Sequence, residues 1–474
     1  MSDTPASVQQ KALRINLDPT RYGTFAEIGA GQEVARNFFR VGGASGTVAK
    51  TSSAYDMAVS DAIYGPADRY VSRQRLVAML DREYGLLVDR LGTTRANTAL
   101  FVFADTVATS GFRTKNEAHG WMGIRFQAEP GAAPSDILIH VRMLDKEAER
   151  QQEVLGVLGV NLVHGTFYAF QRPEALIGEL LDGLTWEHVE VDMIRFSGPA
   201  FAGVDNRLMA LQLVKSGHTE AAMFTADGDA VQWAEVLYKK PVLVQRGSYH
   251  PMTNPMLDML TRAEAQFVRE PGLEGERPVV LLEMTLRQLT VGDEINHRDF
   301  LDRVDMLSAL GHPVLISNFL RYHRLVSYLS RYTPKPIGLP LGAVRLRDVL
   351  DERFYTDVPG GIFQGLGQMF RRGVKVYVYP SLDGSGGVTT ARTLTVAPHL
   401  RHLYAHLLEN HLVEDLPEYT REFLPTSSGR VLEQIRSGDP AWVRHVPPPL
   451  AAVIRDKRLF GYAGPEPVLS EPAR

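Results

Sequence analysis

Short apolar runs rich in β-branched and aromatic residues alternate with segments of helical periodicity through the middle of the chain. A strand followed by a helix, repeated at this spacing, is typical of a mainly parallel, buried sheet. We therefore predict strands over residues 99–106, 121–127, 136–144, 189–198, 221–228, 241–249, 278–286, 313–319, 336–342 and 375–380. The segment EPGAAPS between the second and third runs has no helical pattern, so we expect these two runs to form an antiparallel hairpin.

Apolar residues spaced three and four positions apart predict helices before and between the strands. In the first 95 residues they indicate helices over 31–40 and 71–91, so we expect this region to be mostly helical apart from its glycine loops. Between the later strands they indicate helices over 204–216, 256–269, 298–310, 322–332, 346–354 and 361–371.

These patterns predict an α/β fold with a mainly parallel core of repeated βα units. The core is either a barrel-like closed sheet or an open doubly wound sheet. The βα units run from residue 189 to residue 380 without a long break, which slightly favours barrel-like closure. We expect three parts: a glycine-rich helical region over 1–95, the α/β core over 96–380, and one strand with a helical extension and a Pro-rich tail over 381–474.

Composition and charge narrow the class of protein. The net charge of −4 over 474 residues argues against a nucleic-acid-binding protein, which would be basic. The chain has no cysteine, so disulfides and thiol nucleophiles are excluded. We see no apolar signal segment near the N-terminus and no run of about eighteen apolar residues. We therefore expect a soluble, cytoplasmic protein that does not bind membranes.

A glycine-rich block over residues 22–64 comes close to two phosphate-binding motifs and matches neither. Gly29-Ala-Gly31 begins like the dinucleotide fingerprint GxGxxG, but Val34 stands where the third glycine belongs. The segment that ends at Lys50 begins like a P-loop, but Ala49 stands where glycine must precede the lysine. The simpler interpretation of these glycines is a chain that turns sharply before a helix.

Looser phosphate binding by the same block stays open. Backbone N–H groups of Gly42, Gly43 and Gly46 can cradle an anion, with Lys50 as a point charge. The alternative is a tight turn with an exposed lysine. The 14 histidines include no HExxH or HxH pattern, so we predict no metal site from motifs, although carboxylates leave Mg²⁺ possible.

Polar residues near the ends of the apolar runs are the candidate site, because ligands of α/β folds bind at the carboxyl ends of strands. Arginine forks suit phosphate or carboxylate, and acids beside them suit general acid–base chemistry. The alternative is structural salt bridging within the sheet. The segment QRGSYHP, residues 245–251, is the densest of these ends. We predict Glu283, Asp192 and His140 as catalytic residues, and Arg246, Ser248, Arg195, Arg142, Arg125 and Asn318 as ligand-binding residues together with the glycine block.

Several segments spread over almost the whole chain resemble a bacterial family of similar length. They include INLDPTRYGTFAEIGAGQEVARNFFR, HGWMGIRFQ, SGPAFAGVDNRLMALQLVKSG, AEVLYKKPVLVQRGS and IRDKRLFGY. Members of that family carry two incompatible names, nicotinate-nucleotide adenylyltransferase and TonB-dependent receptor. The first would need an HxGH or TxGH motif, which the chain lacks, and the second would need an export signal, which we do not expect here. The resemblance implies a soluble α/β core and carries over no catalytic residue.

Two functions remain after these steps. The first is an enzyme or binding protein for a phosphorylated or carboxylated small molecule, with the reaction left open. The second is a non-catalytic, homo-oligomeric scaffold, in which the glycine-rich block and the LFGY segment at residues 459–462 are contact surfaces between copies. Under either interpretation we expect a homo-oligomer.

Overall fold

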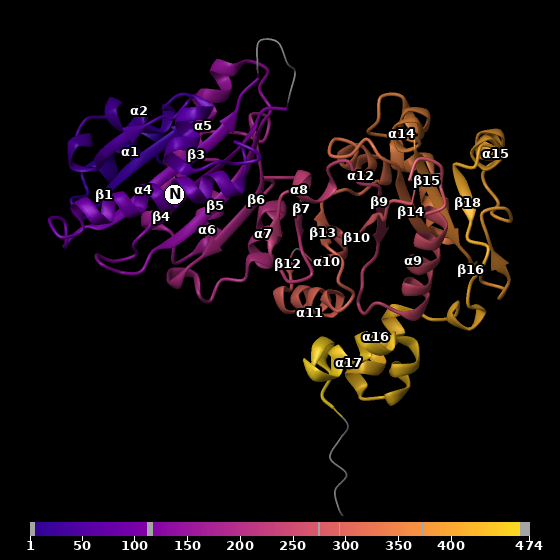
Figure 1. The fold of residues 1–474 in the computed structure, drawn as a ribbon. Helices are drawn as coiled ribbons and strands as arrows, with labels where there is room; N and C mark the ends of the chain where they lie inside the picture. Colours follow the sequence, from indigo (N-terminus) through magenta and orange to yellow (C-terminus); the bar gives the residue numbers. More distant parts are fainter. Residues whose placement is uncertain (1–4, 111–116, 274, 293, 372, 465–474) are drawn as a thin grey trace, which may run out of the picture. The chain divides into compact units, whose positions relative to one another are not determined.

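The computed structural model describes residues 5–110, 117–273, 275–292, 294–371 and 373–464 (Figure 1). The chain divides into two compact units, Met1–Ala222 and Met223–Arg474, called unit 1 and unit 2 below. Both combine helices with a sheet, so the predicted α/β class is confirmed. Within the described ranges, every helix is too short or too polar to cross a lipid bilayer.

Unit 1 contains a six-stranded sheet in the order β2-β1-β3-β4-β5-β6. Its strands are β1 (Arg21–Ile28), β2 (Val48–Ser52), β3 (Ala99–Ala108), β4 (His119–Phe126), β5 (Ser135–Met143) and β6 (Val189–Ser197). β1 is parallel to β2 and β3, whereas the pairs β3–β4, β4–β5 and β5–β6 are antiparallel. The predicted hairpin of β4 and β5 is confirmed, but this sheet is mixed and not mainly parallel.

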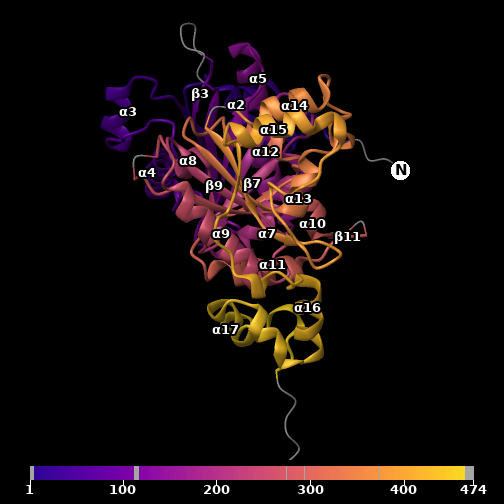
Figure 2. The same cartoon turned by 90° about the vertical axis from the view of Figure 1, so that its right-hand side faces the viewer.

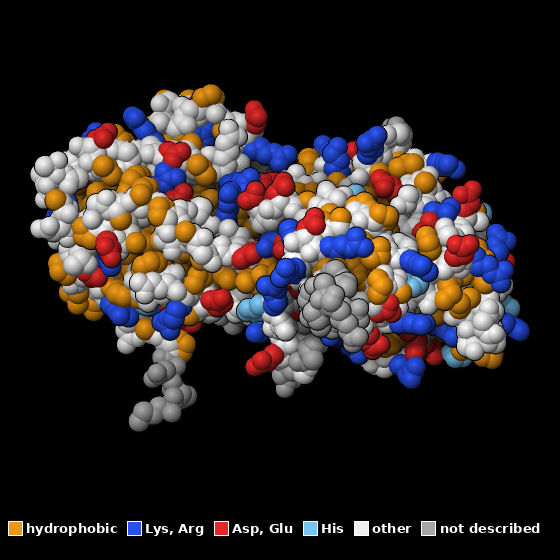
Figure 3. Space-filling view, turned by 90° about the horizontal axis from the view of Figure 1, so that it is seen from below, with side chains coloured by type: hydrophobic (Ala, Val, Ile, Leu, Met, Phe, Trp, Pro, Cys, Tyr) orange, Lys and Arg blue, Asp and Glu red, His pale blue; other side chains and the backbone are white. Residues whose placement is uncertain are grey.

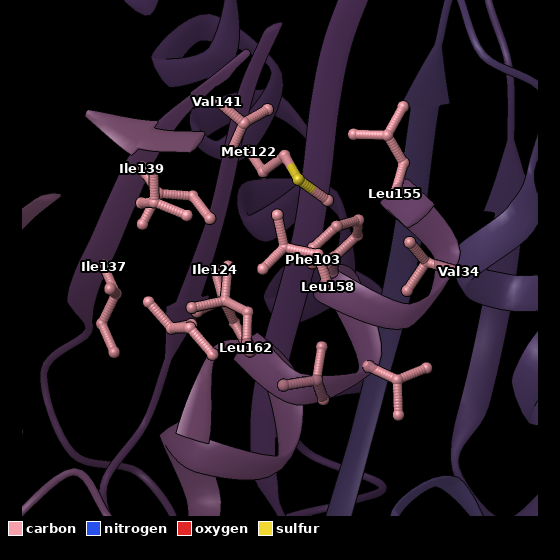
Figure 4. Packing of buried hydrophobic residues seen from close by; sticks show 14 of the residues in the cluster. Val34, Phe103, Met122, Ile124, Ile137, Ile139, Val141, Leu155, Leu158 and Leu162 are labelled. Atoms are coloured by element: carbon pink, nitrogen blue, oxygen red, sulfur yellow. The ribbon is translucent and has the colours of Figure 1, made fainter. Parts of the chain in front are cut away.

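One face of this sheet carries the main hydrophobic core of unit 1. Alternate residues of the central strands, such as Phe103, Ile124 and Ile139, point toward helix α5 (Ala148–Tyr168), as Figure 4 shows. Helices α1 (Val8–Asn16) and α2 (Glu33–Arg40) pack against α5. Gly159 makes this close contact possible, because a Cβ there would lie 2.3 Å from a methyl group of Val34.

The opposite face is covered over β1, β3 and β4 by helix α4 (Arg73–Leu91). The predicted helical periodicity is confirmed, since Leu76, Met79, Leu80 and Leu87 are all buried. Leu76 lies over Gly123, on the face opposite to Ile124. A short helix, α3 (Met57–Tyr64), contacts α4.

Unit 2 contains an eight-stranded sheet in the order β18-β15-β14-β9-β10-β13-β7-β8. Its strands are β7 (Ala221–Phe224), β8 (Ala230–Val231), β9 (Val242–Arg246), β10 (Val279–Thr285), β13 (Val314–Ser317), β14 (Ile337–Gly342), β15 (Val374–Tyr379) and β18 (Val413–Asp415). Neighbouring strands from β18 to β13 are parallel. β18 and β8 lie at opposite ends, so the sheet is open and the slight preference for a barrel was wrong.

The parallel strands of unit 2 have the order of a doubly wound fold. Numbered along the chain from β9 to β18, their order across the sheet is 3-2-1-4-5-6. The direction of winding reverses between β9 and β14. The crossovers contain α9 (Asn254–Phe267), α11 (His297–Ser308), α12 (Tyr322–Leu329), α13 (Ala343–Val349), α14 (Gly361–Met369) and α15 (Arg401–Glu409).

The C-terminal helices of unit 2 lie beside α11. Figure 2 shows α16 (Ser428–Ser437) and α17 (Pro448–Asp456) below that helix, and α17 contacts it. Leu450 and Ile454 of α17 are fully buried, and the backbone N–H of Phe460 donates to the carboxylate of Asp302 at 2.7 Å. This extension is therefore packed on the α/β part of unit 2.

The two units do not coincide with the predicted three-part division. The predicted boundary at 95/96 separates β1 from β3, which pair over eight residues in one sheet. The predicted helices α2 and α4 are present, but strands β1 and β2 were missed. β1 is buried on both faces, so its polarity does not alternate, and Gly23 within it contacts the ring of Phe101. β18, after residue 381, also belongs to the core sheet.

Candidate functional site

The residues predicted for the site fall into separate groups, one set in each unit. Unit 2 contains Glu283, Arg246, Ser248 and Asn318, and unit 1 contains His140, Asp192, Arg125, Arg142, Arg195, Gly42, Gly43, Gly46 and Lys50. We describe each group within its own unit.

A pocket of about 690 Å³ lies in unit 2 at the carboxyl ends of β9, β10 and β14. Residues 245–249, which run from the end of β9 into the following loop, form part of its wall, Thr285 ends β10, and Gly342 ends β14. This is the point at which the winding of the sheet reverses. Open α/β sheets bind ligands at such a switch point, because the loops on either side diverge there. The segment QRGSYHP, the best single prediction from the sequence, supplies Arg246 and Ser248 to this wall.

A buried ion pair holds Arg246 in place. Nε and Nη2 of Arg246 donate to the two carboxylate oxygens of Glu283 at 2.8 and 2.7 Å. Glu283 lies opposite Arg246 in the β9–β10 register and has no exposed surface. The hydroxyl of Ser317 donates to the same carboxylate at 2.6 Å. Glu283 is not among the residues that line the pocket, and it contacts the pocket wall through Arg246.

The pocket has an excess of positive charge. Arg287, Arg321 and Arg345 line it together with Arg246, and Asp348 is the one acid among the lining residues. Arg345 pairs with Asp348 at 3.1 Å, and both side chains are exposed. Nε of Arg321 donates to the carbonyl of Phe354 at 2.8 Å. Arg287 is exposed and has no hydrogen bond or ion pair with any residue that the structure describes.

Two hydroxyl groups in the pocket are also available to a ligand. The side chains of Ser248 and Tyr322 line it, and neither hydroxyl has a hydrogen-bond partner in the described part of the chain. The guanidinium of Arg246 lies 4.6 Å from the ring centre of Tyr322. Burial raises the pKa of Tyr322, so its phenol stays protonated and can donate. Met256 and Tyr355 contribute apolar surface to the wall of the pocket.

The sequence analysis missed Arg287, Arg321, Arg345 and Tyr322. Each follows a strand end by two to five residues, in or next to the first turn of the following helix. A search for arginines just beyond the predicted strands would have included the three arginines, but not Tyr322. Nothing in the sequence would have separated them from other surface arginines without the strand order.

In unit 1, the structure brings together two of the predicted catalytic residues. Nδ1 of His140 and Oδ1 of Asp192 are 2.6 Å apart, and both side chains are buried. Nε2 of His140 is 3.2 Å from Nδ1 of His119, a residue that the sequence analysis did not select. Burial, and then the nearby His140, lower the pKa of His119 to about 4.

Two predicted ligand-binding arginines of unit 1 are instead engaged in ion pairs within the sheet. Arg125 donates to both carboxylate oxygens of Asp136, at 2.7 and 2.8 Å, and also to Asp81. Arg142 donates to Glu190 at 2.7 Å. These contacts match the alternative interpretation, structural salt bridging within the sheet.

Two other predicted residues lie away from these clusters. Arg195 is on β6 opposite Leu138 of β5. Asn318 follows β13 and is exposed, but it is not among the residues that line the pocket of unit 2.

The glycine block forms a turn around Asn16. The side-chain amide of Asn16 donates to the carbonyls of Phe38 and Gly42 at 2.8 and 2.7 Å. Gly43 has a φ of 74°, in the left-handed region that favours glycine. Lys50 donates to the buried carboxylate of Glu83, so it is not a free point charge. This geometry matches the simpler interpretation of the block.

The chain itself supplies the anion at the helix that follows Gly29 and Gly31. The carboxylate of Glu27 accepts hydrogen bonds from the backbone N–H groups of Val34 and Ala35, both at 3.0 Å. These groups belong to the first turn of α2, where a dinucleotide fold would bind phosphate. Burial raises the pKa of Glu27 to about 7. An internal carboxylate therefore takes the place of an external phosphate.

No cluster of three or more His, Asp or Glu side chains suited to a metal ion occurs among the residues that the structure describes.

No protein-family model matches the chain, and no curated protein matches it. Among solved structures, it is similar to the competence/damage-inducible protein CihA from Agrobacterium tumefaciens, at 20% identity and a TM-score of 0.25, over 34% of this chain and 97% of that one. A CinA-superfamily protein from Enterobacter cloacae is 14% identical, with a TM-score of 0.27, over 35% of this chain and 96% of that one. Another from Klebsiella pneumoniae is 11% identical, with a TM-score of 0.25, over 34% and 95%. At such scores these similarities carry no argument about this chain, and none of these proteins bears either name of the resembling bacterial family.

Proposed function

We propose that unit 2 is an enzyme or binding unit for a phosphorylated or carboxylated small molecule, held in the pocket between β9 and β14. The observation that carries this proposal is the set of four arginines around a pocket at the switch point of a doubly wound sheet. Two of them pair with acids, Arg246 with Glu283 and Arg345 with Asp348. Arg287 and Arg321 have no acidic partner among the described residues. Guanidinium groups bind phosphate and carboxylate with two parallel hydrogen bonds, and an apolar surround strengthens them.

The anionic group of the ligand would meet Arg287, whose guanidinium pairs with none of the described residues, and the hydroxyls of Ser248 and Tyr322. Its less polar part would lie against Met256 and Tyr355. The pocket volume of about 690 Å³ falls within the range usual for small-molecule sites. Arg246 is held by Glu283, so its guanidinium is fixed in the pocket wall at little cost in side-chain entropy, while Glu283 compensates its charge.

A thermal-shift screen with nucleoside monophosphates, sugar phosphates and small carboxylates tests this proposal. A ligand at one hundred times its Kd stabilises the native state by about 2.7 kcal/mol, which raises the melting temperature. Arg287→Ala should abolish most of the response. Arg430→Ala is the matched control, because Arg430 is an exposed arginine on α16 that does not line the pocket. No response to any ligand class, or equal responses in both variants, would contradict the proposal.

The homo-oligomeric scaffold remains a second candidate, supported by a different surface. The LFGY segment packs within its own unit, because Leu459 and Phe460 are buried there. Helix α3 in the glycine-rich block instead exposes apolar side chains, among them Met57 and Val59, with Tyr55 just before it. Exposed apolar patches of this kind are typical of contacts between proteins. Light scattering tests this proposal, since a monomer at micromolar concentration would contradict it.

Nucleic acid is not proposed as a partner. On the face that Figure 3 shows, basic and acidic side chains are interspersed and form no continuous basic strip. This distribution agrees with the net charge of −4.

A further inference from the structure

Arg303, a buried residue of α11, connects the two segments that bring Ser248 and Arg287 to the pocket of unit 2. Its Nη1 donates to the carbonyl of Ser248 at 2.9 Å and to the carbonyl of Gln288 at 3.0 Å. Ser248 belongs to the loop after β9, and Gln288 belongs to α10 (Leu286–Leu289), the turn after β10. Only 3% of the Arg303 side chain is exposed. One guanidinium nitrogen therefore joins two walls of the pocket from behind.

The other terminal nitrogen of Arg303 fixes the guanidinium itself. Nη2 donates to the carboxylate of Asp299, one turn earlier on α11, and lies 3.1 Å from Nδ1 of His250. Each terminal nitrogen carries two N–H groups, so these contacts use all four of them. A lysine has three N–H groups on a single nitrogen and cannot make the same set of contacts. The position therefore requires the shape of a guanidinium and not only a positive charge.

Both segments are stiff next to the carbonyls that Arg303 binds. The side-chain oxygen of Gln288 accepts a hydrogen bond from the backbone N–H of Thr285 at 2.9 Å, which closes the turn that contains Arg287. In the other segment, Tyr249 has a φ of 47°, and its phenol donates to the carbonyl of Gln245 at 2.7 Å. A residue other than glycine keeps this left-handed conformation only where its surroundings hold it. A movement at either carbonyl would therefore displace the whole segment.

The C-terminal extension of unit 2 holds this arrangement without entering the pocket. The ring of Phe460 packs on the ring of His250, with 5.6 Å between ring centres, and the backbone N–H of Phe460 donates to Asp302 of α11. The hydroxyl of Ser428 donates to the carbonyl of Pro251 at 3.1 Å. Phe460 and Ser428 are not among the residues that line the pocket. They act on a ligand there only through the loop after β9 and through α11.

We propose that Arg303 is a positioning residue of the pocket, which fixes the spacing between Ser248 and Arg287, and that Phe460 keeps Arg303 in place. The inference rests on the proposed function, because Ser248 and Arg287 are the expected contacts of the anionic group. A hydroxyl and a guanidinium that are held at a fixed spacing bind an anion of matching size with little further loss of freedom. The C-terminal extension is then part of the binding unit, although it lies outside the pocket.

Hydrogen exchange of the full chain without ligand tests the positioning role by itself. Arg303→Lys keeps the positive charge but loses at least one of the two carbonyl contacts. We expect exchange to become about fivefold faster in residues 247–250 and in residues 286–289, as the loss of one hydrogen bond implies. Phe460→Leu keeps an apolar side chain but removes the ring next to His250. It should accelerate exchange in the same two segments to a smaller extent.

Arg262→Lys is the matched control for Arg303→Lys. Arg262 forms the same type of ion pair on α9, with Asp258 four residues earlier at 2.8 Å. Within the described part of the chain, it makes no hydrogen bond or ion pair with residues 247–250 or 286–289. The control should therefore leave exchange in both segments unchanged, which separates the role of Arg303 from a general loss of stability.

A titration with inorganic phosphate, followed by ³¹P NMR, tests the consequence for binding. Arg303→Lys should weaken phosphate binding by about threefold or more. In the Ser248→Ala background the same change should weaken binding by a smaller factor, because one of the two groups that Arg303 positions is already missing. A general loss of stability would give the same factor in both backgrounds. Arg262→Lys should leave the affinity unchanged.

Three results would overturn the inference. They are unchanged exchange in either segment of Arg303→Lys, equal changes in Arg262→Lys, and equal factors for phosphate binding in the two backgrounds. Unchanged exchange in Phe460→Leu would overturn the role of the C-terminal extension. If Arg303→Lys fails to fold, Phe460→Leu provides the same comparison. Absence of phosphate binding by the unmodified protein would contradict the proposed function but leave the exchange results intact, so the two failures are distinguishable.

Discussion

The sheets of the two units use polar side chains in different ways. In unit 2 the strands are parallel, so their carboxyl ends share one edge, and Arg246, Ser248 and Thr285 gather around one pocket. In unit 1 strands β3 to β6 are antiparallel, so successive carboxyl ends lie at opposite edges. Arg125 near the end of β4 therefore faces Asp136 near the start of β5, and Arg142 near the end of β5 faces His119 at the start of β4.

This difference decides when a polar strand end indicates a site. A parallel sheet collects such residues at one place, and they become a binding edge. An antiparallel sheet spreads such residues over both of its edges, so each one meets mainly the neighbouring strand, as in the Arg125–Asp136 pair. Pairing across strands also occurs in the parallel sheet, between Arg246 and Glu283, but Arg246 there stays beside the other strand ends. The rule that ligands bind at carboxyl ends applies to the first arrangement only.

Removal of Glu283 should give the largest loss of stability. It tests whether the ion pair of unit 2 is fully buried. Glu283→Ala leaves the charge of Arg246 buried without its partner, which costs about 3 to 5 kcal/mol. Urea denaturation followed through the transition of unit 2 measures this loss. The double variant Glu283→Leu with Arg246→Met should recover most of it. A loss below about 1 kcal/mol would mean that the pair is solvated, as surface pairs are.

The next effect concerns Glu27 in unit 1, whose folded-state pKa lies near 7 because of burial. The group binds its proton more tightly when folded than when unfolded. Below about pH 4.5 the buried Glu27 therefore does not lower the free energy of unfolding. As the pH rises to about 7, it lowers that free energy progressively, by at most about 3 kcal/mol. Glu27→Gln should remove this part of the decline. We expect the two melting curves to converge at low pH, and a constant difference across the range would contradict the buried acid.

A smaller effect is expected where α2 and α5 cross in unit 1. Gly159→Ala places a methyl group 2.3 Å from a Val34 methyl position, so the helices must separate. Overpacking of this kind costs about 1 to 3 kcal/mol. Gly178→Ala is a matched control on a helix of the same unit, because a Cβ there meets nothing within 4 Å. Thermal denaturation of both variants checks the prediction, and equal midpoints would show that the crossing is loose.

The smallest effect on stability is expected for Arg287→Ala, which should change ligand binding alone. Arg287 is exposed and makes no hydrogen bond or ion pair with the described residues, so Arg287→Ala should leave stability within about 0.5 kcal/mol of the unmodified protein. The same change should weaken binding of the best phosphorylated or carboxylated ligand by about tenfold or more, because a charge-assisted hydrogen bond is lost. Calorimetric titration measures the ratio. Arg430→Ala should leave both quantities unchanged.

The positions of most strands could be predicted from the sequence, because apolar runs such as 99–106 and 336–342 correspond closely to β3 and β14. β1 was not predicted because it is buried on both faces and because Gly23 interrupts its apolar pattern. Local patterns do not contain strand order, which comes from long-range pairing. The open sheet therefore had to be seen in the structure.

The candidate site could be predicted in part, for the same reason. QRGSYHP stood out as a dense polar strand end, and Arg246 and Ser248 do line the pocket. Arg287 and Arg345 become its neighbours only because β10 and β14 flank β9. His140 and Asp192 were selected separately, and their contact depends on the β5–β6 register, which includes an irregularity just after His140.

Hydrogen exchange of the full chain, with and without the ligand that gives the largest thermal shift, tests the central claim most directly. The account predicts slower exchange in residues 245–249, 285–288, 320–322 and 341–349, the segments around the pocket of unit 2. Exchange in residues 42–50 of the glycine-rich block should be unaffected. Protection of the glycine block without protection of these four segments would contradict the account.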